Sequence, residues 1–383
     1  MTLRLLALRS LILLAFVAAA TLPLHAGPFD ATKVESVVTV AEDDDSAAVP
    51  ADIEPVVATA AMRPRLTGAF LQLWESDLEN SEEFWRDELG AMRAAGMRLV
   101  IPQYSTSGDT DLTPAIEKIL KVAEELKMQV FVGTMLDEQG WYSNKLNPFF
   151  LAKERVKVAN YTGELVKRFK DCKAFGGLYI PYEDNTLSLP GSMGAFYGAI
   201  AEAGRAEKPG LKVMISPFTT PRPGLAKSLP TWMINRYFKS MLAKAKVDII
   251  AWQDGVGGTT KQIDRIPHDL APIASAARSL GISIWGNCEV FHRTSPLSEA
   301  FEAEPTTMDV LERQIEGAAP FVDRFICFDF NHYFSPRLGP KAEKLYRDYC
   351  AWAGIRLKTP RSSAFSRGCR PASPWRKPRS KSS

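Results

Sequence analysis

The chain has 383 residues, and its 47 basic and 44 acidic side chains leave a formal net charge of only +3. This balance excludes a strong electrostatic partner, so no nucleic-acid binding is expected. The five cysteines show no C-x-x-C spacing, which argues against a zinc site.

The N-terminal stretch has the pattern of a secretory signal peptide. Two arginines precede the apolar run Leu11–Ala20, which is too short to cross a bilayer comfortably, and small residues follow it. Cleavage is expected after Ala26, with Ala20 as the alternative. A buried N-terminal helix is the competing interpretation. We therefore predict export of the protein to the periplasm or the medium, with residues 1–26 removed and no stable membrane anchor afterwards.

Two further segments are poor in residues that build a core. Residues 27–64 contain the acidic run Glu42–Asp45 with prolines and many small residues, which predicts a disordered linker. Residues 356–383 are rich in Arg, Lys, Ser and Pro, which predicts a solvated basic tail. Binding of an anionic surface by this tail is the alternative.

Residues 65–355 predict a single (β/α)8 TIM barrel of the α/β class. Short, continuous apolar runs alternate with helical patterns, as in parallel strands that are covered on both faces. A single domain of this length is normal for such a barrel. The predicted strands are Leu66–Leu73, Arg98–Tyr104, Gln129–Met135, Gly177–Tyr182, Lys212–Pro217, Asp248–Trp252, Ser283–Asn287 and Arg324–Asp329.

Capping residues support the helices between these runs. Ser81 is the expected N-cap of a helix over Glu82–Ala95, and Pro114 stands in the first turn of the next helix. Gly96 and Gly281 each lie between a helix and a strand, which is typical of a helix C-terminus.

A doubly wound open sheet is the rival architecture. It would normally carry a glycine-rich phosphate loop after its first strand, but Gln72 and Trp74 follow that strand and no G-x-G-x-x-G is present. Gly255–Gly258 lacks the third spaced glycine and is interpreted as a tight loop. Eight strand–helix units favour the barrel, and no cofactor is expected.

Polar and aromatic residues gather where the predicted strands end, which is where barrel enzymes carry their chemistry. Amides and carboxylates bind sugar hydroxyls, while Trp and Tyr rings stack on the flat C–H faces of sugars. Each aromatic residue taken alone is more often core packing, so the prediction depends on the coincidence across the strand ends. The predicted substrate-binding residues are Gln72, Trp74, Gln103, Tyr104, Tyr142, Gln253, Asp254, Asn287 and His332.

Glu183 and Glu289 are the predicted catalytic pair. Each follows an apolar strand directly, where an unused and unpaired carboxylate would be costly. The fourth and seventh strands face each other across the mouth, so the two carboxylates can flank a glycosidic bond. The alternative is that each makes a salt bridge or caps a helix. In a retaining glycosidase the two carboxyl groups lie about 5–5.5 Å apart, against roughly 6.5–9.5 Å for inversion.

Other chemistries have weaker support. The nucleophile elbow G-x-S-x-G is absent, because Gly191–Gly194 does not have its spacing. His292 and His332 fall near strand ends, so a metal site with Asp254 or Asp329 is conceivable. No H-E-x-x-H spacing supports it, and no metal is expected.

Five segments together resemble the bacterial family called domain of unknown function 4434. The resemblance covers about Arg65 to Trp352, and the family resembles a branch of the glycoside hydrolase barrels. The segments are Gly68–Gln72, Leu99–Tyr104, Gly177–Glu183, Trp252–Gly257 and Trp285–Phe291.

The placement of the two glutamates is also similar to the large retaining glycosidase clan that uses strands four and seven. That likeness implies Glu183 as acid/base and Glu289 as nucleophile. The clan usually has Asn before the strand-four Glu, but Tyr182 stands here. Asn287 or Asn185 is the candidate for the missing contact to the sugar 2-hydroxyl.

Two functions follow from these observations. The intact glutamate pair favours a retaining glycosidase that acts on an extracytoplasmic polysaccharide or oligosaccharide. The missing Asn favours a catalytically silent barrel that binds carbohydrate or scaffolds a surface complex. A metal-dependent hydrolase is a third possibility that would need clustered His and Asp.

Overall fold

The computed structural model describes residues 63–357, except 145–146, 185–187, 220–228 and 297–298. The predicted signal peptide lies outside the described residues, as do residues 27–62 of the predicted linker and 358–383 of the predicted tail. Within the described part of the chain, no helix is both long and apolar enough to cross a membrane.

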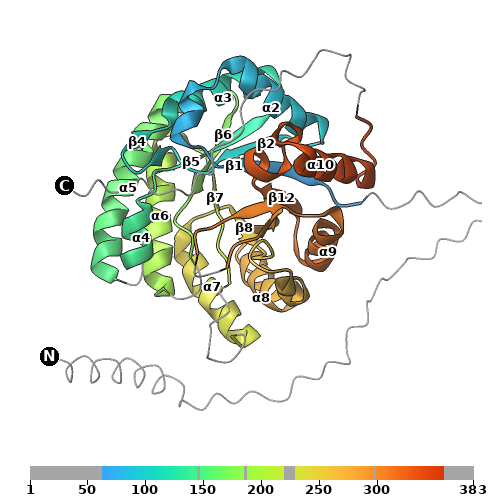
Figure 1. The fold of residues 1–383 in the computed structure, drawn as a ribbon. Helices are drawn as coiled ribbons and strands as arrows, with labels where there is room; N and C mark the ends of the chain where they lie inside the picture. The colour runs from blue at the N-terminus through green and yellow to red at the C-terminus, as the bar shows by residue number, and fades with distance from the viewer. Residues whose placement is uncertain (1–62, 145–146, 185–187, 220–228, 297–298, 358–383) are drawn as a thin grey trace, which may run out of the picture. The chain divides into compact units, whose positions relative to one another are not determined.

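Eight parallel strands form a closed barrel, which Figure 1 shows from one end with the helices around it. Neighbours follow the order β1-β12-β9-β8-β7-β6-β5-β2, and β2 closes onto β1. The barrel strands are β1 (Leu66–Leu71), β2 (Leu99–Pro102), β5 (Gln129–Gly133), β6 (Phe175–Ile180), β7 (Lys212–Ile215), β8 (Ile249–Gln253), β9 (Ser283–Glu289) and β12 (Arg324–Phe328).

Nine α-helices are described. They are α2 (Glu82–Ala94), α3 (Thr113–Glu125), α4 (Glu138–Asn144), α5 (Pro148–Phe169), α6 (Pro190–Glu207), α7 (Thr231–Ala245), α8 (Ile266–Arg278), α9 (Met308–Ala318) and α10 (Pro340–Trp352). Short helical turns are η1 (Glu75–Glu79), η2 (Thr260–Arg265), η3 (Ala319–Phe321), η4 (Phe330–Phe334) and η5 (Pro336–Leu338).

The predicted barrel is confirmed. Every predicted strand run overlaps one barrel strand, and no end differs by more than two residues. These strands are apolar along their whole length because alternate side chains fill the barrel interior and the remaining side chains pack against the helices. An open doubly wound sheet is excluded by the pairing of β1 with both β2 and β12.

The capping predictions are also confirmed. The Ser81 side chain accepts a hydrogen bond from the backbone N–H of Phe84, and Pro114 lies in the first turn of α3. Gly96 and Gly281 have φ values of +90° and +70°, which only glycine adopts without strain. These caps fix where each helix turns back toward the next strand.

The core has two layers, as expected for a barrel. The outer layer packs the sheet against the helices and includes the buried, unpaired thiols of Cys288 and Cys327. The inner layer fills the barrel and consists of Phe70, Leu99, Ile101, Phe131, Tyr179, Met214, Ile249, Ala251, Trp285 and Ile326.

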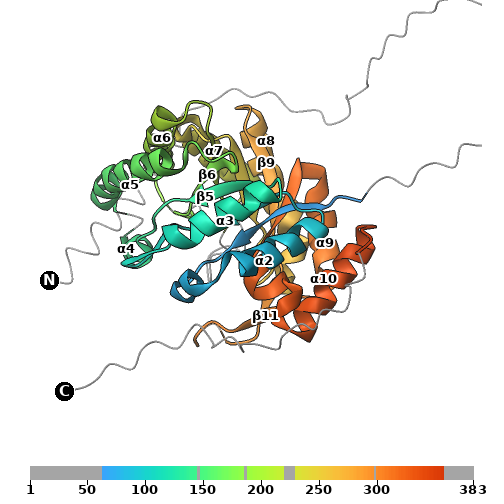
Figure 2. The same cartoon turned by 90° about the horizontal axis from the view of Figure 1, so that it is seen from above.

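Additional elements follow three of the strands at their C-terminal ends. The turn η1 follows β1, the hairpin β3–β4 (Thr106–Ser107 and Thr110–Asp111) follows β2, and the hairpin β10–β11 (Phe291–Arg293 and Ala303–Pro305) follows β9. In Figure 2 the β10–β11 hairpin projects from the lower side of the barrel. The elaborated face is therefore the one onto which the strands deliver Glu183 and Glu289.

Candidate active site

Strand alternation brings polar side chains to the mouth directly above the inner core. Trp285 on β9 lies in the inner layer, so Asn287 and Glu289, two and four residues later, point to the same side. Ala251 on β8 also lies in the inner layer, so Gln253, two residues later, points to the mouth as well. The top of the barrel is thus lined by amides and a carboxylate.

The first two strands continue this polar layer. Phe70 and Ile101 belong to the inner core, which directs Gln72 and Gln103 toward the mouth. The side-chain oxygen of Gln103 is buried and has no hydrogen-bond partner among the described residues. An orphaned acceptor of this kind marks a position where a ligand hydroxyl or a water would be stabilised.

The glycine-rich loop after β8 holds the Glu289 carboxylate. The backbone N–H of Gly257 donates to Oε2 of Glu289 over 2.7 Å. A Cβ on Gly257 would lie 2.4 Å from the Phe291 ring and 2.7 Å from that same oxygen. The loop that the sequence predicted only as a tight turn therefore needs glycine so that its main chain can approach the carboxylate.

Asp254 lies beside Glu289 and is almost fully buried. Its carboxylate accepts from the backbone N–H groups of Val256 and Glu289 and from the side-chain amide of Gln314 on α9. The same Gln314 amide donates to the backbone oxygen of Glu289 over 3.0 Å. Asp254 and Gln314 thus fix the end of β9 and, with it, the position of Glu289.

Asp254 is buried and Glu289 is partly exposed at the mouth, and carboxylates this close disfavour simultaneous ionisation. Burial, followed by the charge of Asp254, raises the pKa of Glu289 to about 8, and Glu183 adds to this rise through its own charge. Burial likewise raises the pKa of Asp254 to about 7. The protonated form of Glu289 is therefore favoured near neutral pH.

Two other polar residues of the mouth make their hydrogen bonds away from Glu289. Asn287 donates to Oγ of Ser216, and Tyr104 hydrogen-bonds with Gln72. The contacts that favour the ionised form of Glu289 come from the main chain of Gly257 and Gly258, and burial outweighs them.

Glu183 follows β6 by three residues and is held by aromatic side chains. The Tyr179 hydroxyl, which reaches up from the inner core, donates to Oε1 of Glu183 over 3.0 Å. The indole N–H of Trp141 on α4 donates to the backbone oxygen of Glu183 over 3.3 Å. The interaction of Glu183 with Glu289 places both carboxylates in one electrostatic site.

Tyr182, which stands where the retaining clan has Asn, faces the helices. It is fully buried in the outer core layer, and its hydroxyl donates to Oε1 of Glu154 on α5 over 2.7 Å. It therefore cannot make the sugar contact that the clan's Asn makes. Asn287 remains as a candidate, because its Nδ2 donates to Ser216 while its buried Oδ1 has no partner among the described residues.

A second polar cluster lies at the ends of β1 and β12. The rings of Trp74 and His332 stack with centroids 3.8 Å apart, and Nδ1 of His332 lies 2.8 Å from Oδ2 of Asp329. Burial lowers the pKa of His332, but Asp329 outweighs it, so the pKa lies above its usual value. Gln72 joins this cluster through main-chain hydrogen bonds with the Asn331 amide.

The predicted site residues therefore fall into connected groups. Gln253 and Asn287 both hydrogen-bond Ser216, Asp254 supports Glu289, Trp74 stacks on His332, and Gln72 pairs with Tyr104. Tyr142 lies in α4, and its side chain is outside the described residues, as is Asn185.

Four supporting residues were not singled out as site residues from the sequence. Two of them could have been recognised from the sequence. Tyr179 precedes Glu183 by four residues, so strand alternation puts both on the inner face, and Gly257 stands in a glycine-rich loop. Ser216 ends a strand, but Gln314 lies on an outer helix with nothing local to mark it. Among the described residues, no three His, Cys, Asp or Glu side chains are grouped so that they could hold a metal.

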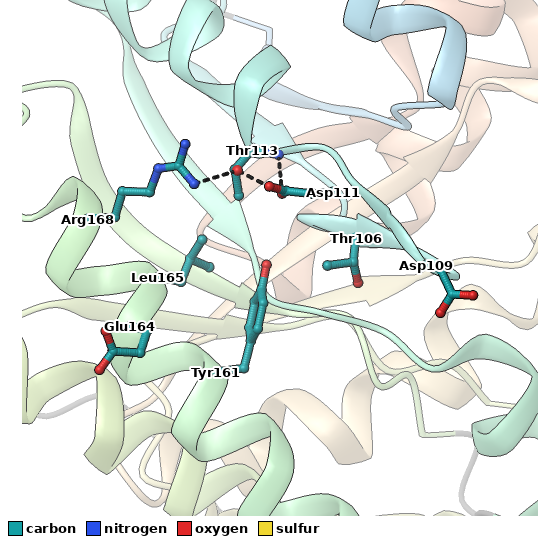
Figure 3. Close-up of a pocket in the computed structure, with 8 residues that line it drawn as sticks. All are labelled: Thr106, Asp109, Asp111, Thr113, Tyr161, Glu164, Leu165 and Arg168. Atoms are coloured by element: carbon teal, nitrogen blue, oxygen red, sulfur yellow. Dashed lines mark hydrogen bonds between the residues drawn. The ribbon is translucent and has the colours of Figure 1, made fainter.

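A cavity of about 410 Å³ lies outside the barrel, between the β3–β4 hairpin and the helices α3 and α5 (Figure 3). Arg168 donates to Oγ1 of Thr113, whose hydroxyl in turn donates to Asp111. These polar groups satisfy one another across the cavity wall, so we place the candidate active site at the barrel mouth.

Comparisons with known proteins agree with this architecture. Residues 66–339 match the family described as "Domain of unknown function (DUF4434)". No curated protein matches the chain. The chain is similar in structure to "a putative alpha-L-fucosidase" from Bacteroides thetaiotaomicron, with 21% identity and a TM-score of 0.62 over 79% of this chain and 100% of the other.

Two further structures are similar to this chain at lower TM-scores. One is a GH5_18 protein from Streptomyces cattleya in complex with GlcNAc, with 14% identity, a TM-score of 0.47 and coverage of 79% and 83%. The other is an intracellular xylanase from Thermoanaerobacterium saccharolyticum, with 12% identity, a TM-score of 0.43 and coverage of 70% and 88%. At 21% identity the likeness to the first of these three structures shows the fold alone, which is a (β/α)8 barrel.

Proposed function

The chain belongs to the DUF4434 family, and we propose that it is an exported retaining glycosidase that acts on an extracytoplasmic polysaccharide. One observation carries the proposal. Two carboxylates, Glu183 after β6 and Glu289 at the end of β9, share one electrostatic site at the mouth of the barrel. A pair of carboxylates is what glycoside hydrolysis requires.

In the first step Glu289 is the nucleophile and Glu183 the general acid. An oxygen of Glu289 bonds to the anomeric carbon, the glycosidic C–O bond breaks, and the proton of Glu183 passes to the leaving oxygen. In the second step Glu183 takes a proton from water. The water oxygen bonds to the anomeric carbon, the ester to Glu289 breaks, and the sugar leaves with its original configuration.

The surroundings of Glu289 prepare it for this cycle. In the reactive arrangement Glu289 is ionised and Glu183 carries the proton that it donates. The N–H group of Gly257 favours the ionised form of Glu289, while burial and Asp254 oppose it. A nucleophile whose charge is only weakly stabilised by its surroundings is more reactive once it is ionised.

The polar layer around the pair provides the sugar contacts in this proposal. Gln72, Gln103 and Gln253 point their amides to the mouth. The buried oxygen of Asn287, which has no partner in the described part of the chain, is an acceptor beside Glu289. Amides that surround a carboxylate pair can orient a ring that carries several hydroxyls. The Trp74–His332 stack lies on the β1–β12 side of the same mouth.

Isosteric variants test the assignment. Glu289→Gln should lower turnover on a cleaved polysaccharide by about a thousandfold or more while binding and folding persist. Glu183→Gln should slow natural substrates far more than aryl glycosides with good leaving groups. Glu125→Gln, an exposed residue that pairs with Arg86 on the outer helices, is the matched control.

Proton NMR of the first product reports its configuration. A product that is first formed with the inverted anomer would contradict retention. Wild-type behaviour of both glutamate variants on a truly cleaved substrate would show that the catalytic pair is wrong.

A catalytically silent carbohydrate-binding barrel is the second candidate. The specific observation in its favour is that Tyr182 faces the helices, so the clan's Asn contact is missing from that position. Binding of a polysaccharide without turnover in the presence of intact Glu183 and Glu289 would establish this alternative.

The N-terminal segment supports the proposed location. Export predicts a mature protein that begins at Gly27 after cleavage at Ala26. Mass spectrometry of the protein recovered from periplasm and medium measures this directly. Recovery of the full-length chain from the cytoplasm alone would contradict export.

A further inference from the structure

Glu183 lies beyond the end of the strand that delivers it. The strand β6 ends at Ile180, where it pairs with Ile215 of β7, and Glu183 follows three residues later. Glu289, in contrast, is the last residue of β9 and pairs with Phe328 of β12. The sheet therefore fixes the main chain of Glu289, whereas Glu183 lies outside this ladder and depends on contacts of another kind.

Aromatic side chains from two helices hold the main chain at and before Glu183. The hydroxyl of Tyr197 on α6 donates to the backbone oxygen of Tyr182 over 2.5 Å. The indole N–H of Trp141 on α4 donates to the backbone oxygen of Glu183 over 3.3 Å. Each of these two residues is thus joined to a different helix through its carbonyl group.

Asp184, directly after Glu183, is held in a third way. Its side chain is 1% exposed, and a carboxyl group buried to that extent is costly unless it is hydrogen-bonded. The hydroxyl of Tyr237 on α7 donates to Oδ2 of Asp184, and the hydroxyl of Ser188 donates to Oδ1 over 2.7 Å. The two hydroxyl oxygens themselves lie 2.7 Å apart, so the three side chains form one compact cluster.

The main chain of Asp184 extends this cluster to the next strand. Its backbone oxygen accepts from the backbone N–H of Phe218 over 3.0 Å, and Phe218 follows the end of β7 by three residues. Asp184 therefore joins the chain after β6 to α7 through its side chain and to the chain after β7 through its carbonyl group. Both contacts act one residue away from Glu183.

We propose that Asp184 is a positioning residue for Glu183, and that Tyr237 and Ser188 act on Glu183 only through the Asp184 carboxylate. This role rests on the proposed function, in which Glu183 protonates the leaving oxygen. A general acid must lie within about 2.6–3.2 Å of the atom that it protonates. Misplacement by about 1 Å can lower a rate by about a hundredfold, so the chain beyond β6 needs this support.

Kinetics on two leaving groups test the proposal. Tyr237→Phe and Ser188→Ala each remove one hydroxyl from Asp184. For a phenyl glycoside of the cleaved sugar, whose leaving group needs protonation, kcat/KM should fall roughly five- to tenfold. For the dinitrophenyl glycoside, which leaves without an acid, it should change by less than about twofold. A loss of folded enzyme would lower both values equally, and that result would overturn the proposal.

Tyr346→Phe is the matched control. The hydroxyl of Tyr346 on α10 is also largely buried, and it donates to the backbone oxygen of Ala91 on α2 over 2.9 Å. These two helices follow β12 and β1, on the other side of the barrel from β6 and β7. The ratio of the two kcat/KM values should stay at its wild-type level. The same change of ratio in this control as in Tyr237→Phe would contradict a role specific to Asp184.

A double-mutant cycle tests whether Tyr237 acts through Asp184. Asp184→Ala should change the ratio in the same direction as Tyr237→Phe. Adding Tyr237→Phe to Asp184→Ala should then have no further effect, because the acceptor of its hydroxyl is already gone. Losses that multiply would show that Tyr237 acts independently of Asp184.

NMR of the carboxyl carbons in protein with labelled glutamate separates failure of this proposal from failure of the glycosidase. The Glu183 resonance is identified by its loss in Glu183→Gln. It should move in Tyr237→Phe and keep its position in Tyr346→Phe, whether or not the protein cleaves a glycoside. A wild type without turnover refutes the glycosidase, yet the moved resonance still supports the positioning by Asp184. An unmoved resonance in Tyr237→Phe refutes that positioning.

Discussion

Glu289 and Glu183 lie at the same mouth, but their supports are of different kinds. Glu289 is fixed by main chain and buried polar groups, namely the Gly257 N–H, Asp254 and the Gln314 amide. Glu183 is fixed by aromatic side chains, namely the Tyr179 hydroxyl and the Trp141 indole. The first arrangement includes the charge of Asp254, which raises the pKa of Glu289, whereas the second positions Glu183 through two aromatic hydrogen-bond donors.

The comparison predicts its largest effect at Gly257. In Gly257→Ala the added Cβ would meet both the Phe291 ring and Oε2 of Glu289, so the carboxylate must move. We expect kcat/KM to fall by about a hundredfold or more, because small misplacements of catalytic groups are costly. Gly258→Ala is the control, since its Cβ would approach only Gly255 O at 3.6 Å. Equal activity of the two variants would contradict the role of the loop.

The next effect concerns the pH dependence of turnover. A nucleophilic Glu289 must be ionised, so kcat/KM should rise with pH toward its pKa of about 8. Asp254→Asn removes a negative charge that raises this pKa, so the rising limb should move to lower pH by about one unit. The buried Oε1 of Gln314, which has no partner among the described residues, can accept from the new amide after a flip.

Asp264→Asn, at a largely exposed carboxylate, is the control for that shift. A limb that falls with increasing pH near 8 in the wild type would instead identify Glu289 as the proton donor. The two glutamates would then have exchanged roles.

A smaller effect is expected on the Glu183 side. Tyr179→Phe keeps the ring in the inner core and removes only the hydroxyl that donates to Glu183. The loss of one hydrogen bond to a carboxylate should lower kcat/KM by about tenfold. Tyr349→Phe removes a buried hydroxyl that accepts from the Leu66 N–H at the start of β1, and turnover should remain unchanged. A larger loss in the control would mean that barrel stability explains both results.

The smallest effect is on thermal stability. Because folding raises the pKa of Glu289 above its ordinary 4.5, the folded state binds this proton more tightly than the unfolded state does. This stabilisation is complete below pH 4.5 and disappears as the pH rises through about 8. The Tm of the wild type should therefore fall relative to the Tm of Glu289→Gln between pH 6 and pH 9. A difference that does not depend on pH would contradict the raised pKa.

The sequence determined the barrel and the position of the two carboxylates along it. Eight apolar runs, the cap at Ser81 and the glycines at 96 and 281 are local signals, and their spacing defines strand–helix units. Glu289 follows such a run directly, so its place at the mouth follows from the chain alone. Strand alternation similarly directs Gln72, Gln253 and Asn287 inward.

Tertiary structure decided how those residues are supported. Gln314 is far from Glu289 in the sequence, and only the packing of α9 against the barrel brings its amide to the end of β9. Tyr182 directly precedes Glu183 and faces the outer core, where only the packing of α5 against the barrel brings Glu154 to its hydroxyl. The pKa of Glu289 depends on burial and on the charge of Asp254 from the neighbouring strand's loop. These contacts and the raised pKa depend on distances between residues that are far apart in the sequence, and the spacing of residues along the chain does not encode those distances.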